Sequence, residues 1–275
     1  MIKDFLSKVR VRRKVIDSHA VMVAFPRCGL SRLRDLLWNF MTLHYGIKGG
    51  RTGDFFQLWK QDKSRVPRLF VTNDDNPHTC FPDEIRDEKT IFDGKKVVFL
   101  SRDPRNVIAS LYYRRSRRGY IDSNYYWGTL TDFIREGEGG FETLLTYYAS
   151  WTSPERVKVH HLCYEDLHSN PSKELRRVTE FLGIKKVDPD HYERAVKQTP
   201  AFGDKNTEYE SIPRNSAYLK PELPTNGDSD GVTESEEELK EPYLREFEEE
   251  DLHWLRAQMD AFLPVEFPFY REDIN

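Results

Sequence analysis

The sequence has little cysteine: only Cys28, Cys80 and Cys163 occur in 275 residues. An odd and sparse set of cysteines argues against a disulfide framework and favours a reducing compartment, so we expect a cytoplasmic protein. No two cysteines have the C-x-x-C spacing of a structural zinc site. The sequence therefore predicts neither disulfides nor a metal cofactor.

Long apolar runs and a large excess of one charge are also missing. No segment has the length and apolar content of a membrane-spanning helix, and the basic residues 1–15 lack the apolar core of a secretory signal. The chain has 42 Lys and Arg against 46 Asp and Glu, a net charge of −4, which argues against general nucleic-acid binding. We expect a partner that is neither a membrane nor a nucleic acid, and the sequence carries no indication of an oligomeric state.

What the sequence does contain begins with a turn between a short apolar run and an amphipathic helical pattern. The turn, residues 25–31, reads FPRCGLS. Gly29 lets the backbone approach a ligand, Ser31 can cap the helix, and Arg27 adds a positive charge. Such a turn directs backbone N–H groups and the positive end of a helix dipole at one point, which suits a phosphate. The G-x-x-x-x-G-K-[ST] motif is absent, so the turn is P-loop-like without the ATP and magnesium signature.

A second strand-and-helix pattern covers residues 95–118. The run VVFL at 97–100 is continuously apolar, as expected of a strand buried on both faces of a parallel sheet. Asp103 and Pro104 then fit the cap and the first position of a helix. The second segment therefore repeats the strand, turn and helix order of the first.

Two polar residues in this second segment are candidate phosphate ligands. Arg102 stands at the strand end, and Ser110 lies two turns into the helix, so both could hold one phosphate. The alternative is that Arg102 forms an ion pair with Asp103 or Asp166.

A third segment reads as a strand over residues 156–163, a Tyr-Glu-Asp-Leu corner at 164–167, and a helix that stops at Gly183. Further strands are expected at 20–25, 68–72 and 96–101. Apolar strands that alternate with helices predict a three-layer α/β domain, with a central parallel sheet of about four to five strands flanked by helices. We expect residues 1–275 to form this single domain.

Taken together, the three segments resemble the sulfotransferase family that uses 3′-phosphoadenosine 5′-phosphosulfate (PAPS). Family members carry a Tyr/Phe-Pro-Lys/Arg-Ser-Gly-Thr-Thr/Ser loop for the 5′-phosphosulfate and an Arg-Asp/Asn-Pro…Ser segment for the 3′-phosphate. They also carry a Tyr-Glu-Asp-Leu corner before a helix that ends in Phe-Leu-Gly. Here these motifs stand at residues 25–31, at 102–104 with Ser110, and at 164–167 with 181–183. The ordered match covers about residues 18–185.

The resemblance implies a sulfotransferase that releases adenosine 3′,5′-bisphosphate, and it implies no metal. It also assigns the nucleotide contacts. Residues 25–31, named the phosphate loop from here on, are implied to bind the 5′-phosphosulfate. Arg102 and Ser110 are implied to bind the 3′-phosphate, and Tyr164 to lie near the adenine. The nucleotide-binding residues assigned in this way are Arg27, Cys28, Gly29, Leu30, Ser31, Arg32, Arg102, Ser110 and Tyr164. The family's final Arg-Lys-Gly segment is missing, and Arg214 is a weak candidate for its role.

The phosphate loop departs from the family pattern. The usual Lys is Arg27, which can stabilise a leaving phosphate oxygen but is a poor proton donor. The usual Ser and first Thr are Cys28 and Leu30, so fewer hydroxyls face the phosphate. We expect catalysis to depend on positioning and on charge stabilisation by Arg27.

The identity of the general base is open, because the family's Lys-Thr-His strand end appears as Val-Thr-Asn at residues 71–73. Asp74 follows directly and is one candidate. His78 is the other, since imidazole ordinarily titrates near neutral pH. The alternative is that residues 74–77, Asp-Asp-Asn-Pro, form a turn without a catalytic role.

The acceptor site is implied to lie on variable loops, about residues 49–56, 120–127 and 200–241. The last stretch is rich in Asn, Ser, Gly, Pro and acids, and we interpret it as a long loop or lid within the domain. Acidic residues near the expected site favour a small polar acceptor of cationic character; they are Asp74, Asp75, Glu208, Glu210, Asp228 and Asp230. The alternative is that these acids form a solvated face.

Three other functions remain open at this point. A small-molecule kinase of related topology would also use the turn at residues 25–31, although the Walker-type Lys has no counterpart. A catalytically idle PAPS-binding protein is suggested by Asn73 and Leu30 in place of the family's His and Thr. Within the enzyme hypothesis, a glycan is an alternative acceptor.

Overall fold

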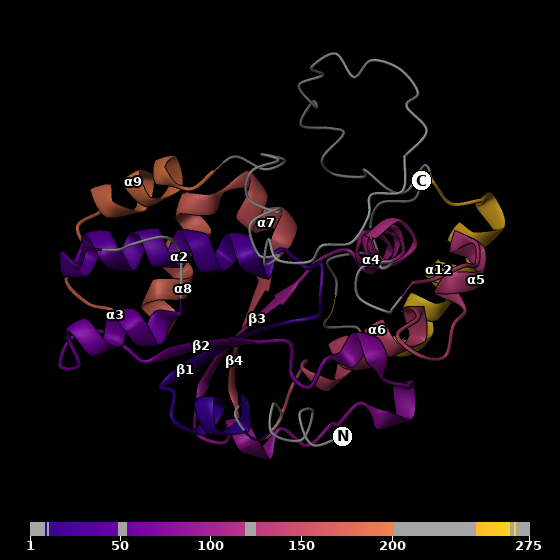
Figure 1. Cartoon of the computed structure of the whole chain (residues 1–275), viewed down its shortest axis with the longest axis horizontal. Coiled ribbons are helices and arrows are strands. Elements are labelled where there is room, and N and C mark those ends of the chain that lie inside the picture. The colour runs from indigo at the N-terminus through magenta and orange to yellow at the C-terminus, as the bar shows by residue number, and fades with distance from the viewer. Residues whose placement is uncertain are drawn as a thin grey trace, which may run out of the picture.

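Four parallel strands form the central sheet, in the order β2-β1-β3-β4 (Figure 1). They are β1 (Ala20–Ala24), β2 (Leu69–Thr72), β3 (Lys96–Ser101) and β4 (Lys158–Cys163). The computed structural model describes residues 9, 11–48, 54–118, 125–200, 246–264 and 267. All four strands expected from the sequence are present and pair in parallel, which confirms the α/β class.

Helices surround this sheet. The α-helices are α2 (Leu30–Tyr45), α3 (Phe55–Gln61), α4 (Pro104–Arg118), α5 (Leu130–Ile134), α6 (Phe141–Ser150), α7 (Tyr164–Ser169), α8 (Pro171–Leu182), α9 (Asp190–Gln198) and α12 (Glu249–Phe262). Three short 3₁₀ helices, η1 (Pro77–Thr79), η2 (Pro82–Glu84) and η3 (Thr90–Phe92), lie between β2 and β3. Figure 1 shows α2, α8 and α9 grouped on one side of the strands and α4, α5, α6 and α12 on the other. Among the helices of the described residues, none has the length and apolar composition needed to cross a bilayer.

The two faces of the sheet pack against different helices. Phe99 of β3 lies against Tyr148 of α6, with ring centroids 5.8 Å apart, and His161 of β4 contacts Phe99 on the same face. His160 points to the opposite face and stacks on Phe181 of α8 at 5.2 Å. The consecutive histidines therefore lie on opposite faces, as the alternation of a strand requires.

Several element boundaries differ from the expected ones by a few residues. β1 ends at Ala24 because the carbonyl of Phe25 accepts a hydrogen bond from the Cys28 N–H within the turn. β4 begins at residue 158 rather than 156. The expected corner at residues 164–167 is the start of the short helix α7. α8 ends before Gly183 as predicted, and this glycine adopts φ 85°.

The strand order has its topological switch point between β1 and β3. The chain leaves β1 toward β2 on one side and leaves β3 toward β4 on the other. Connections that diverge in this way open a crevice at the carboxyl ends of the two strands, where open α/β sheets bind their ligands. The phosphate loop follows β1 and Arg102 follows β3. The topology therefore brings the two expected phosphate-binding segments to one place.

Candidate functional site

The phosphate loop ends at the N-terminus of α2. Gly29 is the N-cap residue with φ 84°, a left-handed conformation that favours glycine, and no side chain caps the helix. The expectation that Ser31 caps it was wrong, because the helix already begins at Leu30 and Ser31 lies within the first turn. Within the described part of the chain, no residue accepts a hydrogen bond from the N–H of Leu30 or Ser31. These two N–H groups can bind an anion.

Gly29 also allows a close approach of Tyr164. A Cβ atom at position 29 would lie 2.4 Å from Cδ2 of the Tyr164 ring, a distance that no packed atoms tolerate. The aromatic ring expected near the adenine therefore lies directly against the phosphate loop. Sequence reasoning assigned both residues to the nucleotide site, and the fold brings them into contact.

Arg27 joins the phosphate loop to α4. Its Nε donates a hydrogen bond of 2.9 Å to Oγ of Ser110, which is buried in that helix. The backbone of Arg27 has φ 77°, a left-handed conformation that costs free energy for a residue with a Cβ atom. A loop residue expected at the 5′-phosphosulfate and a helix residue expected at the 3′-phosphate are thus direct partners.

Cys28 points away from the anion-binding side of the loop. Its side chain is fully buried, and burial raises the pKa of the thiol to about 12. Its Sγ lies 3.1 Å from the hydroxyl of Tyr148 in α6. Its backbone N–H donates to the carbonyl of Phe25. Since the thiol and the backbone N–H both have partners inside the protein, Cys28 holds the loop in place from its buried side.

Arg32 lies in the first turn of α2 and contacts the end of the described segment 125–200. One of its Nη nitrogens donates a hydrogen bond to the carbonyl of Pro200. Partial burial lowers the pKa of its guanidinium. Arg32 therefore ties the phosphate-loop helix to the point at which the expected lid begins.

Arg102 lies beside the phosphate loop and over Tyr164. Its Nη1 donates to the carbonyl of Arg27 at 3.3 Å, and its guanidinium carbon lies 4.4 Å from the centroid of the Tyr164 ring. The alternative of an ion pair with Asp103 was wrong, because that carboxylate accepts hydrogen bonds from Arg105 instead. The Nε of Arg102 is buried, and within the described residues it has no hydrogen-bond acceptor.

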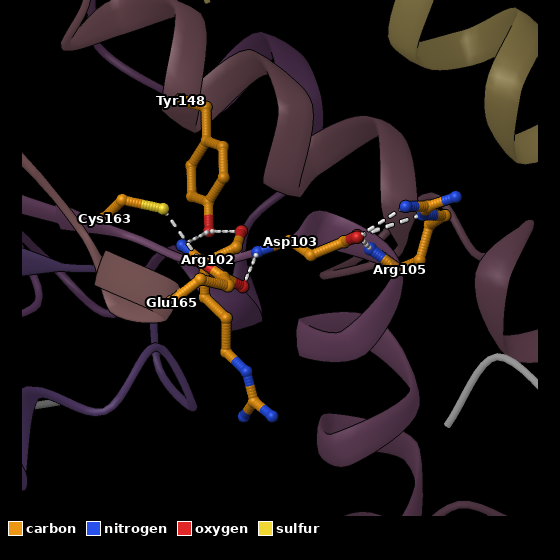
Figure 2. Close-up of polar contacts among 6 residues, drawn as sticks. All are labelled: Arg102, Asp103, Arg105, Tyr148, Cys163 and Glu165. Atoms are coloured by element: carbon orange, nitrogen blue, oxygen red, sulfur yellow. Dashed lines mark hydrogen bonds and ion pairs between the residues drawn. The ribbon is translucent and has the colours of Figure 1, made fainter. Parts of the chain in front are cut away.

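Two side chains that sequence reasoning did not assign to the site hold the backbone around Arg102 (Figure 2). The hydroxyl of Tyr148 accepts from the Arg102 N–H at 3.0 Å and donates to the Arg102 carbonyl at 2.8 Å. The carboxylate of Glu165 accepts from the Asp103 N–H at 2.9 Å and from the Cys163 thiol at 2.8 Å. Glu165 belongs to the Tyr-Glu-Asp-Leu motif, which could have drawn attention to it. No local signal marks Tyr148.

The first base candidate, Asp74, is part of a buried ion pair. Its Oδ2 lies 3.0 Å from Nζ of Lys89, and the exposed fractions of the two side chains are 14% and 3%. Burial raises the pKa of the Asp74 carboxyl, and the charge of Lys89 opposes that rise. Asp74, Asp75 and Asn76 all have positive φ, between 53° and 67°, so the segment after β2 is a left-handed turn.

The second base candidate, His78, lies in η1. Burial, together with the charges of Arg115 and Arg114, lowers the pKa of its imidazole to about 4. The expectation that His78 titrates near neutral pH was therefore wrong. Its carbonyl accepts a hydrogen bond of 2.7 Å from Arg115 of α4.

Asn73, which replaces the family's His, is held at the end of β1. Its Nδ2 donates to the carbonyl of Ala24 at 2.7 Å, and its own carbonyl accepts from the hydroxyl of Tyr147 at 3.3 Å. A carboxamide cannot take up the acceptor's proton. Asn73 therefore connects β2 to the start of the phosphate loop.

A cavity of about 190 Å³ opens at the carboxyl end of β2. Its polar wall includes Asp74, Asp75 and Arg86, and its apolar wall includes Val15, Ile91 and Phe92. Arg86 lies 3.4 Å from Asp75, so two of these charges are paired. Arg214, the acids expected on the lid and most of the expected acceptor loops lie outside the described residues.

The described residues fit a nucleotide with two phosphates. The first-turn N–H groups of α2 suit one anion, and Arg102 supplies a second positive group with a buried nitrogen that lacks an acceptor. Between them, the ring of Tyr164 covers the glycine of the loop. Nitrogen donors for two anions and an aromatic ring beside them suit the two phosphates and the base of such a ligand.

Comparison with known proteins gives the same family. The profile of the sulfotransferase domain family matches residues 17–218. Sulfotransferase 2A1 from Homo sapiens is 22% identical over 212 residues, which cover 71% of this chain and 70% of that protein. Sulfotransferase 1A1 from Rattus norvegicus is 24% identical over 123 residues, which cover 44% of this chain and 40% of that protein. The crystal structure of mouse sulfotransferase SULT7A1 complexed with PAP aligns over 70% of this chain and 69% of its own, with a TM-score of 0.45 and 15% identity.

Proposed function

This chain belongs to the sulfotransferase domain family, and from that premise we propose that it transfers a sulfuryl group from PAPS to a small polar acceptor. The observation that carries the proposal is the hydrogen bond between Arg27 of the phosphate loop and Ser110 of α4. This bond joins the motif expected at the 5′-phosphosulfate to the motif expected at the 3′-phosphate, where β1 and β3 end side by side. Around this contact, the described residues present nitrogen donors for two separate anionic groups.

We propose the following contacts for the donor. The N–H groups of Leu30 and Ser31 hold the 5′-phosphosulfate, and Arg102 with Ser110 holds the 3′-phosphate. Tyr164, which already lies against Gly29 and beneath Arg102, packs on the adenine side of the nucleotide. Hydrogen bonds from a charged guanidinium are about twice as strong as neutral ones, so Arg102 is the main source of discrimination for the 3′-phosphate.

In the transfer step, a bond forms between the acceptor oxygen or nitrogen and sulfur while the bond from sulfur to the 5′-phosphate oxygen breaks. The leaving phosphate oxygen keeps the electron pair and gains negative charge. Arg27 is placed on the phosphate loop to stabilise that charge, and its bond to Ser110 fixes its Nε beforehand. Donors that are already in place cost no reorganisation at the moment of reaction.

We propose Asp74 as the group that takes the acceptor's proton. Burial raises the pKa of its carboxyl, which makes the carboxylate a stronger base than an exposed one, whereas His78 has become a weaker base. The acceptor then enters the cavity that Asp74 and Asp75 line. Its volume of about 190 Å³ favours a small molecule over a glycan chain.

The expected preference for a cationic acceptor stays a prediction from the sequence. Lys89 pairs with Asp74 and Arg86 pairs with Asp75, so both described acids have their charge offset. Any attraction for a cation then depends on the acids of residues 200–241. Salt screens such attraction, which makes the preference measurable.

The test is transfer of radiolabelled sulfate from PAPS by the full chain. The acceptor panel holds neutral phenols, sugars, cationic alcohols and amines, and an anionic glycan, each at low and high salt. We expect transfer to at least one small acceptor, and transfer at least about a hundredfold slower in the Arg27→Ala variant. Binding of adenosine 3′,5′-bisphosphate without transfer to any acceptor would instead identify an idle binding protein. Turnover that needs ATP and magnesium would identify a kinase.

A further inference from the structure

The hydroxyl of Tyr148 stands where three polar groups of the nucleotide site meet inside the protein. It contacts the N–H and the carbonyl of Arg102 and the thiol of Cys28. Tyr148 comes from α6, Arg102 from the end of β3 and Cys28 from the phosphate loop. The Tyr148 side chain of α6 thus contacts both the phosphate loop and the Arg102 strand end.

The proton positions at this junction follow from the capacity of a hydroxyl. A tyrosine hydroxyl has one proton to donate and two lone pairs to accept with. The proton goes to the Arg102 carbonyl at 2.8 Å, and one lone pair accepts from the Arg102 N–H at 3.0 Å. The second lone pair must therefore accept the proton of the Cys28 thiol, whose Sγ lies 3.1 Å away. Burial keeps both the thiol and the phenol protonated, because it raises the pKa of each.

The backbone of Arg102 needs these contacts. The ladder between β3 and β4 ends at the pair Ser101 and Cys163, so Arg102 has no strand partner for its N–H and carbonyl. A buried backbone N–H or carbonyl without a hydrogen-bond partner destabilises the fold. Tyr148 satisfies both groups of Arg102, and Glu165 satisfies the N–H of Asp103 next to it. Figure 2 shows the two side chains holding this turn from different directions.

The Tyr148 ring is itself fixed by packing. It meets Phe99 edge-on with centroids 5.8 Å apart and stacks on Phe267 at 5.5 Å. Its exposed fraction is 0%. The hydroxyl therefore occupies one position, and a displacement of α6 would reach the Arg102 backbone directly.

We propose that Tyr148 is a positioning residue that couples the phosphate loop to the Arg102 strand end and so sets the direction of the Arg102 guanidinium toward the nucleotide. The inference rests on the proposed function, since it takes the bound ligand to be a nucleotide with a 3′-phosphate. Tyr148 touches neither the ligand nor the reacting atoms in this proposal and acts through Arg102 and Cys28.

The test is a double-variant cycle on the affinity for adenosine 3′,5′-bisphosphate, measured by calorimetry with the full chain. Tyr148→Phe removes only the hydroxyl, and we expect affinity to fall about tenfold or more. The affinity for adenosine 5′-monophosphate, which lacks the 3′-phosphate, should fall less than about threefold in the same variant. In an Arg102→Ala background, Tyr148→Phe should lower the affinity for the bisphosphate less than about twofold, because the effects of substitutions at coupled residues are not additive.

A matched control separates positioning from general destabilisation. Tyr192 of α9 is also buried, and its hydroxyl lies 2.9 Å from Oγ1 of Thr179. Tyr192→Phe should reduce thermal stability by a similar amount and leave bisphosphate affinity unchanged. At the loop, Cys28→Ala should weaken the bisphosphate more than Cys28→Ser, which keeps a donor toward Tyr148. Equal losses in both cysteine variants would contradict the coupling.

A measurement without nucleotide keeps this inference apart from the proposed function. Amide hydrogen exchange at Arg102, followed by NMR, should accelerate at least about tenfold in Tyr148→Phe and stay unchanged in Tyr192→Phe. Failure of the unmodified chain to bind the bisphosphate would sink the proposed function alone. Additive losses in the double-variant cycle, or an unchanged exchange rate at Arg102, would overturn the role given to Tyr148.

Discussion

The Nε of Arg27 donates a hydrogen bond of 2.9 Å to Oγ of Ser110, which lies 83 residues further along the chain. Arg27 belongs to the turn after β1, whereas Ser110 lies in the helix after β3. The strand order places β1 and β3 side by side, so two residues from separate motifs become partners. This contact makes the phosphate loop and α4 one structural unit.

Arg27→Ala should lower kcat by about a hundredfold to a thousandfold, because it removes a positive group from the oxygen that gains charge in the transition state. The affinity for PAPS should fall much less, since the charge develops only as the bond breaks. Steady-state kinetics with titration of the bisphosphate separates the two effects. The control is Arg34→Ala. Arg34 lies in α2 and forms an ion pair with Asp35 at 3.3 Å. An unchanged kcat in Arg27→Ala would remove Arg27 from the mechanism.

Arg102→Ala should weaken adenosine 3′,5′-bisphosphate by about 1.5–3 kcal/mol, the usual contribution of a hydrogen bond to a charged group. Adenosine 5′-monophosphate should bind almost as before, because it has no 3′-phosphate. Calorimetric titration of both ligands gives the comparison. Equal losses for the two nucleotides would refute the assignment of Arg102 to the 3′-phosphate.

Gly29→Ala should destabilise the protein more than Gly46→Ala does. The two glycines cap the N-terminus and the C-terminus of α2. Both Gly29 and Gly46 have positive φ, 84° and 65°, but only a Cβ at 29 would meet a neighbour, 2.4 Å from the Tyr164 ring. Gly46→Ala should cost about 1 kcal/mol of backbone strain. Gly29→Ala adds the displacement of Tyr164 and should also weaken nucleotide binding. Chemical denaturation of both variants tests this, and equal losses of stability would show that the ring moves without cost.

Asp74→Asn should lower kcat by at least about a hundredfold if its carboxylate takes the acceptor's proton. Asp75→Asn is a close control, because Asp75 has the same left-handed backbone and also faces a cation, Arg86 at 3.4 Å. Bisphosphate affinity should be similar in both variants, which shows that the fold is kept. A kcat in Asp74→Asn no lower than in Asp75→Asn would make Asp74 a purely structural partner of Lys89.

The low pKa of His78 predicts a loss of stability in acid. Its pKa is about 4 in the folded protein against 6.5 for an ordinary histidine. Between these values the unfolded chain binds the proton and the folded protein does not, so the free energy of unfolding falls as pH drops from 6.5 toward 4. His78 should contribute on the order of 2–3 kcal/mol to this fall.

His78→Gln should therefore flatten that pH dependence, measured by urea unfolding across the window. Part of the slope should persist, because burial also lowers the pKa values of His44, His160 and His161. A slope as steep as in the unmodified protein would show that folding does not lower the pKa of His78.

Local patterns in the sequence determined the strands, the turn at Gly29 and the helix stop at Gly183. Apolar runs must be buried, and a left-handed backbone favours glycine, so these features depend on neighbours close in sequence. The order of the three motifs was enough to indicate the family, while the residues assigned to the two phosphates stay predictions. The single-domain organisation, the lid and Arg214 stay predictions.

Only the tertiary structure decided what surrounds the site residues. It turned Cys28 into the interior toward Tyr148, paired Asp74 with Lys89, and lowered the pKa of His78 through burial near two arginines. Each of these outcomes depends on groups from distant segments. Hydrogen-bond partners and local solvation are properties of a position in space, and the charge state of a buried group follows from them. The sequence specified which groups were available, and the packing of α6 and η1 against the sheet ends specified their chemistry.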